Sequence, residues 1–568
     1  MRIDLILIGS PNQSLPDWQL GQIHPATPDP AVLAEISVGL DPDVDYLLFW
    51  DSGLGLPDSQ VVISTTQLPG DVWHAGLSLG MGGLPQMMNY VDPVWRFNRD
   101  PFPEVVATSW RLSLRACLVR AEAIRQLGGP DPWFRSLTGA SLELGHRWIR
   151  HGAIMRHVAH LIPVTDELVV HHQQAPLEDD IRFLRLRYGR MWTAWACWRL
   201  WRQGVGLGEI IRVFLRPFSP GRTPAAGLHA LEDDGLSRPK SGHNGHSLNN
   251  VGLTGFDKET VPVSVLIPTL DRYPYLFNLL DQLRAQTIQP LQIIVVDQTA
   301  GESRDKDWPE RFPDLPLQVI YREQAGQCSS RNAGLAVVKG KYVLFLDDDD
   351  VISPDLIARH LGFLYRFGVD ASCGVAEEAG AGMLPDDFTR IRNSDVFPTN
   401  NTMLRTGSLH ASGLFDLAYE RGERADGDLG MRLYLAGQEL VLNPGARVLH
   451  LHAPRGGLRK HNARVITRSA SRESMDHRHL LAPTEAYLWC RYFTTDQVKE
   501  AVLIRTVGTL RGRQTGLRRL IRMAYLTLLL PDTHRQNRSR MDQGRHLLRN
   551  YPSIPAYHPL EEEEFLTA

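Results

Sequence analysis

The sequence predicts an α/β fold with mostly parallel sheets, divided into two tandem domains with helical extensions. Short strands that are apolar throughout alternate with amphipathic helices, which is typical of a parallel sheet covered on both faces. A stretch rich in Pro, Gly, Ser, His and Asn, residues 217–260, cannot bury enough apolar surface to fold alone and reads as a linker. Parts of the pattern that follows this linker also occur before it.

The length and composition fit such a two-domain chain and argue against several other classes of protein. At 568 residues, about two to four domains are expected. The 61 Lys and Arg residues are balanced by 64 Asp and Glu residues, which argues against a dedicated nucleic-acid binder. The five cysteines lie far apart without a CxxC motif, so neither a disulfide framework nor a zinc site is expected, and a reducing cytosol fits. No run approaches the roughly 18 apolar residues of a membrane-spanning helix.

In the second half, strands and helices alternate along the chain. The expected strands are 263–268, 291–297 and 341–346, and the expected helices are 275–287 and a stretch that begins at Arg331. In parallel sheets, ligands bind at the carboxyl ends of the strands. Thr269, Asp297 and Asp347 fall at these ends, so they are the first candidates for a binding site.

Four consecutive acids, Asp347 to Asp350, directly follow the last of these strands. Adjacent carboxylates repel one another unless a cation lies among them. Mg²⁺ is commonly held by one or two carboxylates together with substrate phosphates. A solvated loop or helix N-terminus is the alternative, but the position at the end of a buried strand favours a divalent-cation site.

Seven segments of the second half form an ordered set of motifs: 263–269, 294–297, 331–334, 345–350, 400–405, 413–416 and 426–433. In their order and spacing they resemble the motifs of family-2 glycosyltransferases with the GT-A fold, a Rossmann-type fold. The resemblance covers about residues 263–452. It implies an inverting, hexosyltransferase-like enzyme that moves a sugar from a nucleotide-diphosphate sugar to a hydroxyl acceptor. The implied setting is the synthesis of a surface polysaccharide or glycolipid.

The resemblance also implies roles for individual residues. The nucleotide sugar would be bound by Thr269, Asp297, Arg331 and Asp347. The metal, Mg²⁺ or Mn²⁺, would be held by Asp347, Asp349 and His450, with His452 as the competing histidine.

On the acceptor side, Asp426 matches the acid that acts as general base. The pKa of an acceptor hydroxyl is high, so a positioned carboxylate must take its proton during attack. The family often has Glu-Asp where this chain has Ala425-Asp426. Asp428 is the competing acid, and capping of the following helix is the alternative role of Asp426.

The first half resembles a damaged second copy of this pattern. Residues 45–51 resemble 341–347, residues 127–131 resemble 412–416, and residues 144–147 resemble 429–432. In this alignment Gly53 takes the place of Asp349 and Ser141 that of Asp426, and about one βα unit is absent. We therefore interpret the first half as a degenerate, non-catalytic GT-A-like domain. The alternative is a divergent active copy that uses Asp45, Asp51 and Glu143.

The predicted domains are 1–216 for the degenerate copy, 217–260 for the linker, 261–482 for the catalytic domain and 483–568 for a helical extension. The ends of both halves are rich in Arg with Trp or Leu, over 183–216 and 498–530. Such helices pack on their own domain or lie on a membrane surface. The protein is therefore expected in the cytoplasm, with peripheral contact at the inner face of the membrane as an alternative.

Two other functions compete with sugar transfer. A sugar nucleotidyltransferase of similar fold normally carries a Gly-rich, Lys-bearing loop after its first strand, and residues 270–274 do not resemble one. A non-catalytic carbohydrate-binding scaffold would not need Asp347, Asp349 and Asp426. The expected partners are a nucleotide-diphosphate sugar donor and a glycan or glycolipid acceptor, without nucleic acid.

Overall fold

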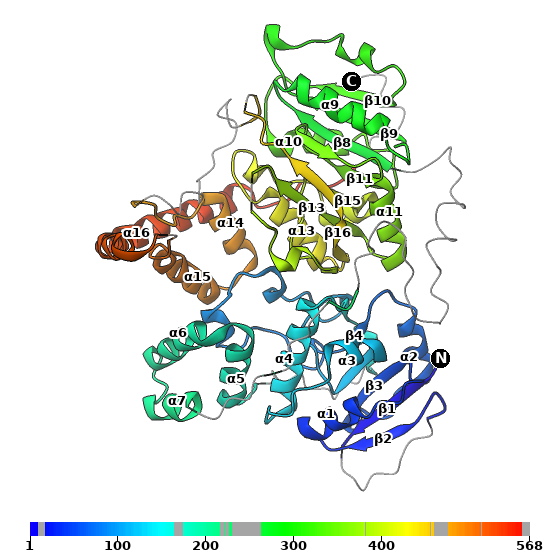
Figure 1. Cartoon of the computed structure of the whole chain (residues 1–568), viewed down its shortest axis with the longest axis vertical. Helices are drawn as coiled ribbons and strands as arrows, with labels where there is room; N and C mark the ends of the chain where they lie inside the picture. The colour runs from blue at the N-terminus through cyan, green and yellow to red at the C-terminus, as the bar shows by residue number, and fades with distance from the viewer. Residues whose placement is uncertain are drawn as a thin grey trace. The chain divides into compact units, whose positions relative to one another are not determined.

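The computed structural model describes residues 1–9, 18–163, 174–215, 221, 227–229, 263–380, 382–454, 456–458, 475–512 and 514–558. The chain forms two compact units (Figure 1). The first consists of Met1–Ala230, Arg390–Asn393 and Tyr434–Glu439, and the second of Leu231–Thr389, Ser394–Leu433 and Leu440–Ala568. The predicted linker lies outside the described residues except for 221 and 227–229. Within the described ranges, no helix is both long and apolar enough to cross a membrane.

The second unit is built on a sheet with the strand order β10-β9-β8-β11-β15-β13-β16-β12. Strands β10, β9, β8 and β11 are parallel, β15 runs antiparallel to both of its neighbours, and β13 and β16 are again parallel. The edge strand β12 is antiparallel to β16. The strands are β8 (Val263–Thr269), β9 (Gln292–Asp297), β10 (Leu317–Tyr321), β11 (Tyr342–Phe345), β12 (Asp350–Ile352), β13 (Ala371–Glu378), β15 (Thr402–Arg405) and β16 (Leu440–His450).

Helices cover this sheet and extend beyond it. They are α9 (Tyr273–Arg284), α10 (Gln327–Leu335), α11 (Leu356–Phe367), α12 (Leu409–Ser412), α13 (Ala425–Leu435), α14 (Pro483–Tyr492), α15 (Thr495–Gly508) and α16 (Gly516–Asn550). The predicted apolar face of α9 is confirmed, because Leu276, Leu279, Leu280 and Leu283 are all buried. Helix α10 lies very close to β8, since a Cβ atom on Gly334 would lie 2.2 Å from Leu266 Cδ1. The predicted α/β architecture of this half is therefore confirmed.

The first unit contains a seven-stranded sheet with the order β2-β1-β3-β6-β4-β7-β5. Its strands are β1 (Ile3–Ile8), β2 (Ile23–Ala26), β3 (Tyr46–Asp51), β4 (Val72–His74), β5 (Ala107–Thr108), β6 (Ala116–Arg120) and β7 (Met155–His157). From β2 to β7 the neighbouring pairs are parallel, parallel, antiparallel, antiparallel and parallel. The pairs from β9 to β16 in the second unit follow the same sequence of directions. Among the described residues, the first unit has no counterpart of β10 beyond β2.

The helices of the first unit are α1 (Pro30–Val38), α2 (Ser59–Thr66), α3 (Ala121–Leu127), α4 (Leu137–Arg150), α5 (Leu177–Arg187), α6 (Gly189–Arg202) and α7 (Leu207–Phe214). For the Arg- and Trp-rich stretch 183–216 the sequence leaves two alternatives, packing on the domain or lying on a membrane surface, and the exposure of the tryptophans in α6 bears on the first. Trp198 and Trp201 are exposed by 43% and 49%, and the buried residues of α6 are Thr193, Ala196, Cys197 and Leu200. Trp192, Trp195, Trp198 and Trp201 recur at every third residue, and positions with this spacing drift around a helix of 3.6 residues per turn, so the four cannot all face one core.

Candidate active site

The carboxyl ends of β8 and β9 bring two of the predicted donor residues side by side. Thr269 and Asp297 are register partners across this strand pair, and both are buried. The Asp297 carboxylate accepts hydrogen bonds from the Tyr273 hydroxyl at 2.8 Å and from the Thr299 backbone N–H at 2.9 Å. The Thr269 hydroxyl donates to Asp348 Oδ2 at 2.8 Å and so links the first strand to the acidic run.

Asp347 opens the acidic run and is its most exposed side chain, at 31%. Arg331, on α10, donates from Nη2 to Asp347 Oδ1 at 2.7 Å. The Asp347 backbone N–H donates to Asp350 Oδ2 at 2.8 Å, which folds the run back on itself. The structure therefore places Arg331 against the first acid of the run, and the predicted contact of Arg331 with the nucleotide stays a prediction.

Asp348 and Asp349 share one guanidinium, that of Arg272, which was not among the predicted site residues. Arg272 Nη1 lies 3.1 Å from Asp348 Oδ1 and 3.3 Å from Asp349 Oδ2. Burial raises the pKa of Asp348 to about 7, against the opposing charge of Arg272, and the neighbouring Asp349 carboxylate acts in the same direction as burial. Arg272 follows Thr269 by three residues, at a strand end where ligand-binding groups gather, and that position could have identified it.

The sheet register surrounds His450 with acidic groups. His450 is the register partner of Asp350 in β12 and of Glu378 in β13. Its Nδ1 lies 3.0 Å from Asp350 Oδ1 and 3.6 Å from Asp349 Oδ1. Burial lowers the pKa of His450, but the hydrogen bond to Asp350 and the nearby carboxylates outweigh burial and raise the pKa to about 9.

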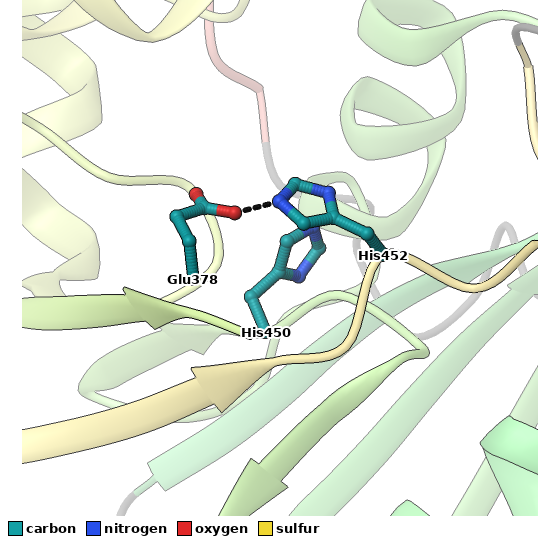
Figure 2. Close-up of side chains that lie close together, drawn as sticks. All are labelled: Glu378, His450 and His452. Atoms are coloured by element: carbon teal, nitrogen blue, oxygen red, sulfur yellow. Dashed lines mark ion pairs between the residues drawn. The ribbon is translucent and has the colours of Figure 1, made fainter. Parts of the chain in front are cut away.

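Glu378, His450 and His452 form a cluster whose candidate ligand atoms all lie within 4.8 Å of one another (Figure 2). His452 and Glu378 form an ion pair, and the two imidazole rings lie 4.4 Å apart at 79°. The structure thus places both candidate histidines at the site. Glu378 was missed because only the β13–β16 register brings it there.

A carboxylate oxygen of Asp349, close to this cluster, is suited to bind a metal ion. Asp349 is almost fully buried, and its Oδ2 accepts a hydrogen bond from the Ala453 N–H at 2.7 Å. Its Oδ1 has no hydrogen-bond partner among the described residues, although it is buried and faces His450. Carboxylate oxygens and imidazole nitrogens are ligands that Mg²⁺ or Mn²⁺ accepts. Asp349 Oδ1 and His450 Nδ1, 3.6 Å apart, therefore offer ligand atoms that suit a divalent cation, and Glu378, His450 and His452 lie close enough together to hold one.

The two candidate bases on α13 have different surroundings. Asp428 is fully buried and accepts from Arg432 Nε at 2.9 Å and from the Tyr492 hydroxyl at 2.7 Å. Asp426, in the first turn of the helix, is half-buried and accepts from the adjacent Gly427 N–H at 2.8 Å. Asp428 is thus held by other side chains, whereas the hydrogen bond that Asp426 accepts among the described residues comes from its own neighbour, with the charge of Arg424 nearby. This contrast favours Asp426 as the residue that could accept a proton.

Asn401, in the segment 400–405, connects the strands that carry Glu378 and His450. Its side-chain N–H groups donate to the carbonyls of Val375 at 3.1 Å and Ala446 at 2.9 Å, which joins β13 to β16. Its Oδ1 lies 2.9 Å from His360 Nε2 on α11. Asn401 therefore fixes the strand pair that holds Glu378 and His450 in register.

Comparison with known proteins identifies part of the chain. Residues 264–413 match the family model described as glycosyl transferase family 2. The chain is 37% identical over 98 residues to the uncharacterized glycosyltransferase YwdF of Bacillus subtilis, covering 17% of this chain and 36% of the relative. It is 29% identical over 114 residues to the glycosyltransferase GlyA of Streptococcus pneumoniae, covering 20% and 16%. The matches thus span about a third or less of these relatives.

Solved glycosyltransferase structures give weaker likenesses. TarS residues 1–349 of S. aureus, in complex with UDP-GlcNAc, has a TM-score of 0.34 and 17% identity, covering 52% of this chain and 93% of that one. The mannosyltransferase PcManGT of Pyrobaculum calidifontis, in complex with GDP-Man and Mn²⁺, has a TM-score of 0.30 and 15% identity, covering 52% and 76%.

Proposed function

Because residues 264–413 form a family-2 glycosyltransferase domain, we propose that this protein transfers a sugar from a nucleotide-diphosphate donor to a hydroxyl acceptor, with inversion and with Mg²⁺ or Mn²⁺. The observation that supports the metal-dependent part of the proposal is the set of acidic and histidine side chains at the carboxyl ends of the strands. There the buried Asp349 Oδ1 lacks a hydrogen-bond partner among the described residues and faces His450, beside the accessible Asp347. A hexose as the sugar, and a glycan or glycolipid as the acceptor, complete the proposal.

In this proposal each group of residues has one task. Thr269, Asp297 and Arg331 line the nucleotide side of the site. When bound, the metal neutralises charge that develops on the leaving diphosphate. Asp426 orients the acceptor hydroxyl and takes its proton during attack. A single displacement on the face opposite the leaving group inverts the sugar carbon.

A thermal-shift screen of nucleotide sugars, with and without Mn²⁺, tests this proposal. A donor at 100 times its dissociation constant should stabilise the protein by about 2.7 kcal/mol. We expect Asp349→Asn to lose the part of this shift that depends on Mn²⁺, and the exposed Asp307→Asn to keep it as the matched control. If Asp349→Asn responds to donor and Mn²⁺ as the wild type does, the metal assignment is wrong.

For the first unit, we propose a degenerate copy that does not catalyse transfer. Arg147 pairs with the buried Glu143 on α4 and donates to the Leu127 carbonyl. Arg432 pairs in the same way with Asp428 on α13 and donates to the Ser412 carbonyl. Both distances along the chain are the same in the two units, four residues to the acid and twenty to the carbonyl. The same arrangement of an arginine between an acid and a backbone carbonyl in both units supports a common origin of the two units. It also gives Glu143 a structural role.

In the first unit, the strand end that corresponds to the acidic run carries Asp51, and the guanidinium of Arg115 pairs with its carboxylate. Arg115 Nε lies 2.6 Å from Asp51 Oδ2, and the Gly53 N–H donates to Asp51 Oδ1 at 2.9 Å. Both carboxylate oxygens of Asp51 are thus occupied, and Gly53 supplies no second acid.

Asp51→Asn should therefore leave turnover and Mn²⁺ affinity unchanged, whereas the matched Asp347→Asn should abolish Mn²⁺-dependent donor binding. Loss of turnover in a folded Asp51→Asn variant would show that the first unit takes part in catalysis.

A further inference from the structure

Helix α16 buries one face and leaves the opposite face apolar and exposed. Its buried residues are Arg522, Leu526, Thr533, Asn537, Met541 and Gly544. Its exposed apolar residues are Leu517, Leu520, Ile521, Tyr525 and Leu528, with exposures between 46% for Tyr525 and 80% for Leu528. At 100° per residue the exposed set is centred about half a turn from the buried set. We call this exposed set the apolar stripe.

The buried face holds α16 firmly on the second unit, in contact with α14 and α15 (Figure 1). A Cβ atom on Gly544 would lie 2.6 Å from the Tyr487 backbone N, so the backbones of α16 and α14 pack closely. Asn537 Oδ1 accepts from the Leu481 N–H at 2.9 Å. The apolar stripe is therefore presented by a fixed helix.

Beyond the apolar stripe, the same face of α16 becomes basic. Arg535, Arg538, Arg545 and Arg549 are exposed there, and Asp542 pairs with Arg545 at 2.7 Å. Over its whole length α16 has eight Arg and two Asp, without Lys or Glu, within a chain of net charge −3. Positive charge is thus concentrated on this helix while the rest of the chain is acidic.

We propose that α16 docks on the surface of an anionic lipid bilayer, with the apolar stripe in the headgroup–acyl boundary and the arginines on lipid phosphates. The charge of the helix complements an anionic surface, and arginine pairs well with phosphate. From Leu517 to Leu528 the stripe is about 18 Å long. A hydrocarbon core is about 30 Å thick, so the stripe can lie along a bilayer but cannot cross it. This surface goes beyond the proposed transfer reaction and would bring the enzyme to acceptors that reside in a membrane.

Co-sedimentation of the full chain with vesicles tests the proposal. We expect binding to equimolar phosphatidylcholine–phosphatidylglycerol vesicles, weakened by salt, and much weaker binding to phosphatidylcholine alone. Leu520→Ser/Leu528→Ser should lower the partition coefficient by about tenfold for each leucine. Arg535→Gln/Arg538→Gln should lower it by about fivefold for each arginine, on the anionic vesicles only.

Two exposed apolar residues elsewhere provide matched controls. Leu56→Ser, at 70% exposure, and Met383→Ser, at 100%, should bind vesicles as the wild type does. All these variants change exposed side chains, so an unchanged melting temperature and unchanged donor thermal shift should accompany them. That second readout separates failure of the docking surface from failure of the proposed transfer reaction.

Three results would overturn the proposal. The first is a lack of binding to anionic vesicles, and the second is binding that the leucine variant leaves unchanged. The third is self-association that the leucine variant abolishes, measured by analytical ultracentrifugation, because a second copy of the chain would then cover the apolar stripe.

Discussion

Asp426→Asn and Asp428→Asn should have opposite effects on rate and stability. The two acids lie two residues apart on α13, and both substitutions remove a charge while they keep the shape. Asp426 is half-buried and accepts one bond, from Gly427, that an asparagine can also accept. Asp428 is fully buried against Arg432 and Tyr492.

The expected magnitudes follow from these surroundings. Removal of a general base costs about 10²–10⁴-fold in rate, or about 3–5 kcal/mol in the barrier. The free energy of unfolding of Asp426→Asn should fall by at most about 1 kcal/mol, since the side chain makes a local bond and its charge lies in the first turn of α13. Asp428→Asn leaves the Arg432 guanidinium, which is only 9% exposed, without its counter-charge. Breaking a buried pair in this way costs about 3–5 kcal/mol of stability.

Release of nucleoside diphosphate at saturating donor and Mn²⁺, measured beside urea unfolding, distinguishes the two variants. Asp426→Asn should lose turnover at unchanged donor affinity, the signature of an interaction made mainly in the transition state. Asp428→Asn should unfold at lower urea yet turn over normally per folded molecule. The reasoning is wrong if Asp428→Asn keeps its stability and loses turnover, or if Asp426→Asn keeps turnover.

Three further predictions concern the second unit. Burial lowers the pKa of His360 to about 4, below its unfolded value of about 6.5, so its contribution to stability is present above pH 6.5 and is lost as the pH falls toward 4. Urea titrations at a series of pH values should show that the free energy of unfolding of the wild type falls by about 3 kcal/mol more than that of His360→Gln between pH 7 and 4. Plots of this free energy against pH that run parallel for the two proteins would contradict the prediction. Gly334→Ala should cost about 1–3 kcal/mol through overpacking, whereas Gly362→Ala, which meets no described atom within 4 Å, should add up to about 1 kcal/mol in the same assay. Glu378→Gln should weaken Mn²⁺ binding in calorimetry by about tenfold or more, while Glu377→Gln should not, and equal effects would exclude Glu378 from the site.

The parts of the fold that local sequence determines were predictable. The strands β8 and β9 are short runs of Val and Ile, and α9 places a leucine on its buried face at every helical turn. Thr269 and Asp297 could be placed at one sheet edge because the carboxyl ends of parallel strands coincide. The same logic placed Asp347, since it follows β11 after a single residue.

Features set by long-range register were not predictable. Glu378 reaches His450 only because β13 and β16 pair in one of several possible registers. The partners of Asp428 include Tyr492, which is 64 residues away on α14, so sequence alone could not separate it from Asp426. Roles that depend on such pairings require the folded chain.

The position of β12 at the sheet edge has a consequence for folding. Asp350 meets His450 across 100 residues of chain, and β12 has no other strand partner in the described sheet. At about 5–20 residues per second, ribosomal synthesis of that interval takes about 5–20 s. During this interval the acidic run has been synthesised but His450 has not, whereas the parallel strands β8 to β11 are complete and can pair with one another. A nascent chain should therefore pair the parallel strands β8 to β11 first and complete the edge that holds Asp350 and His450 only when β16 has been synthesised.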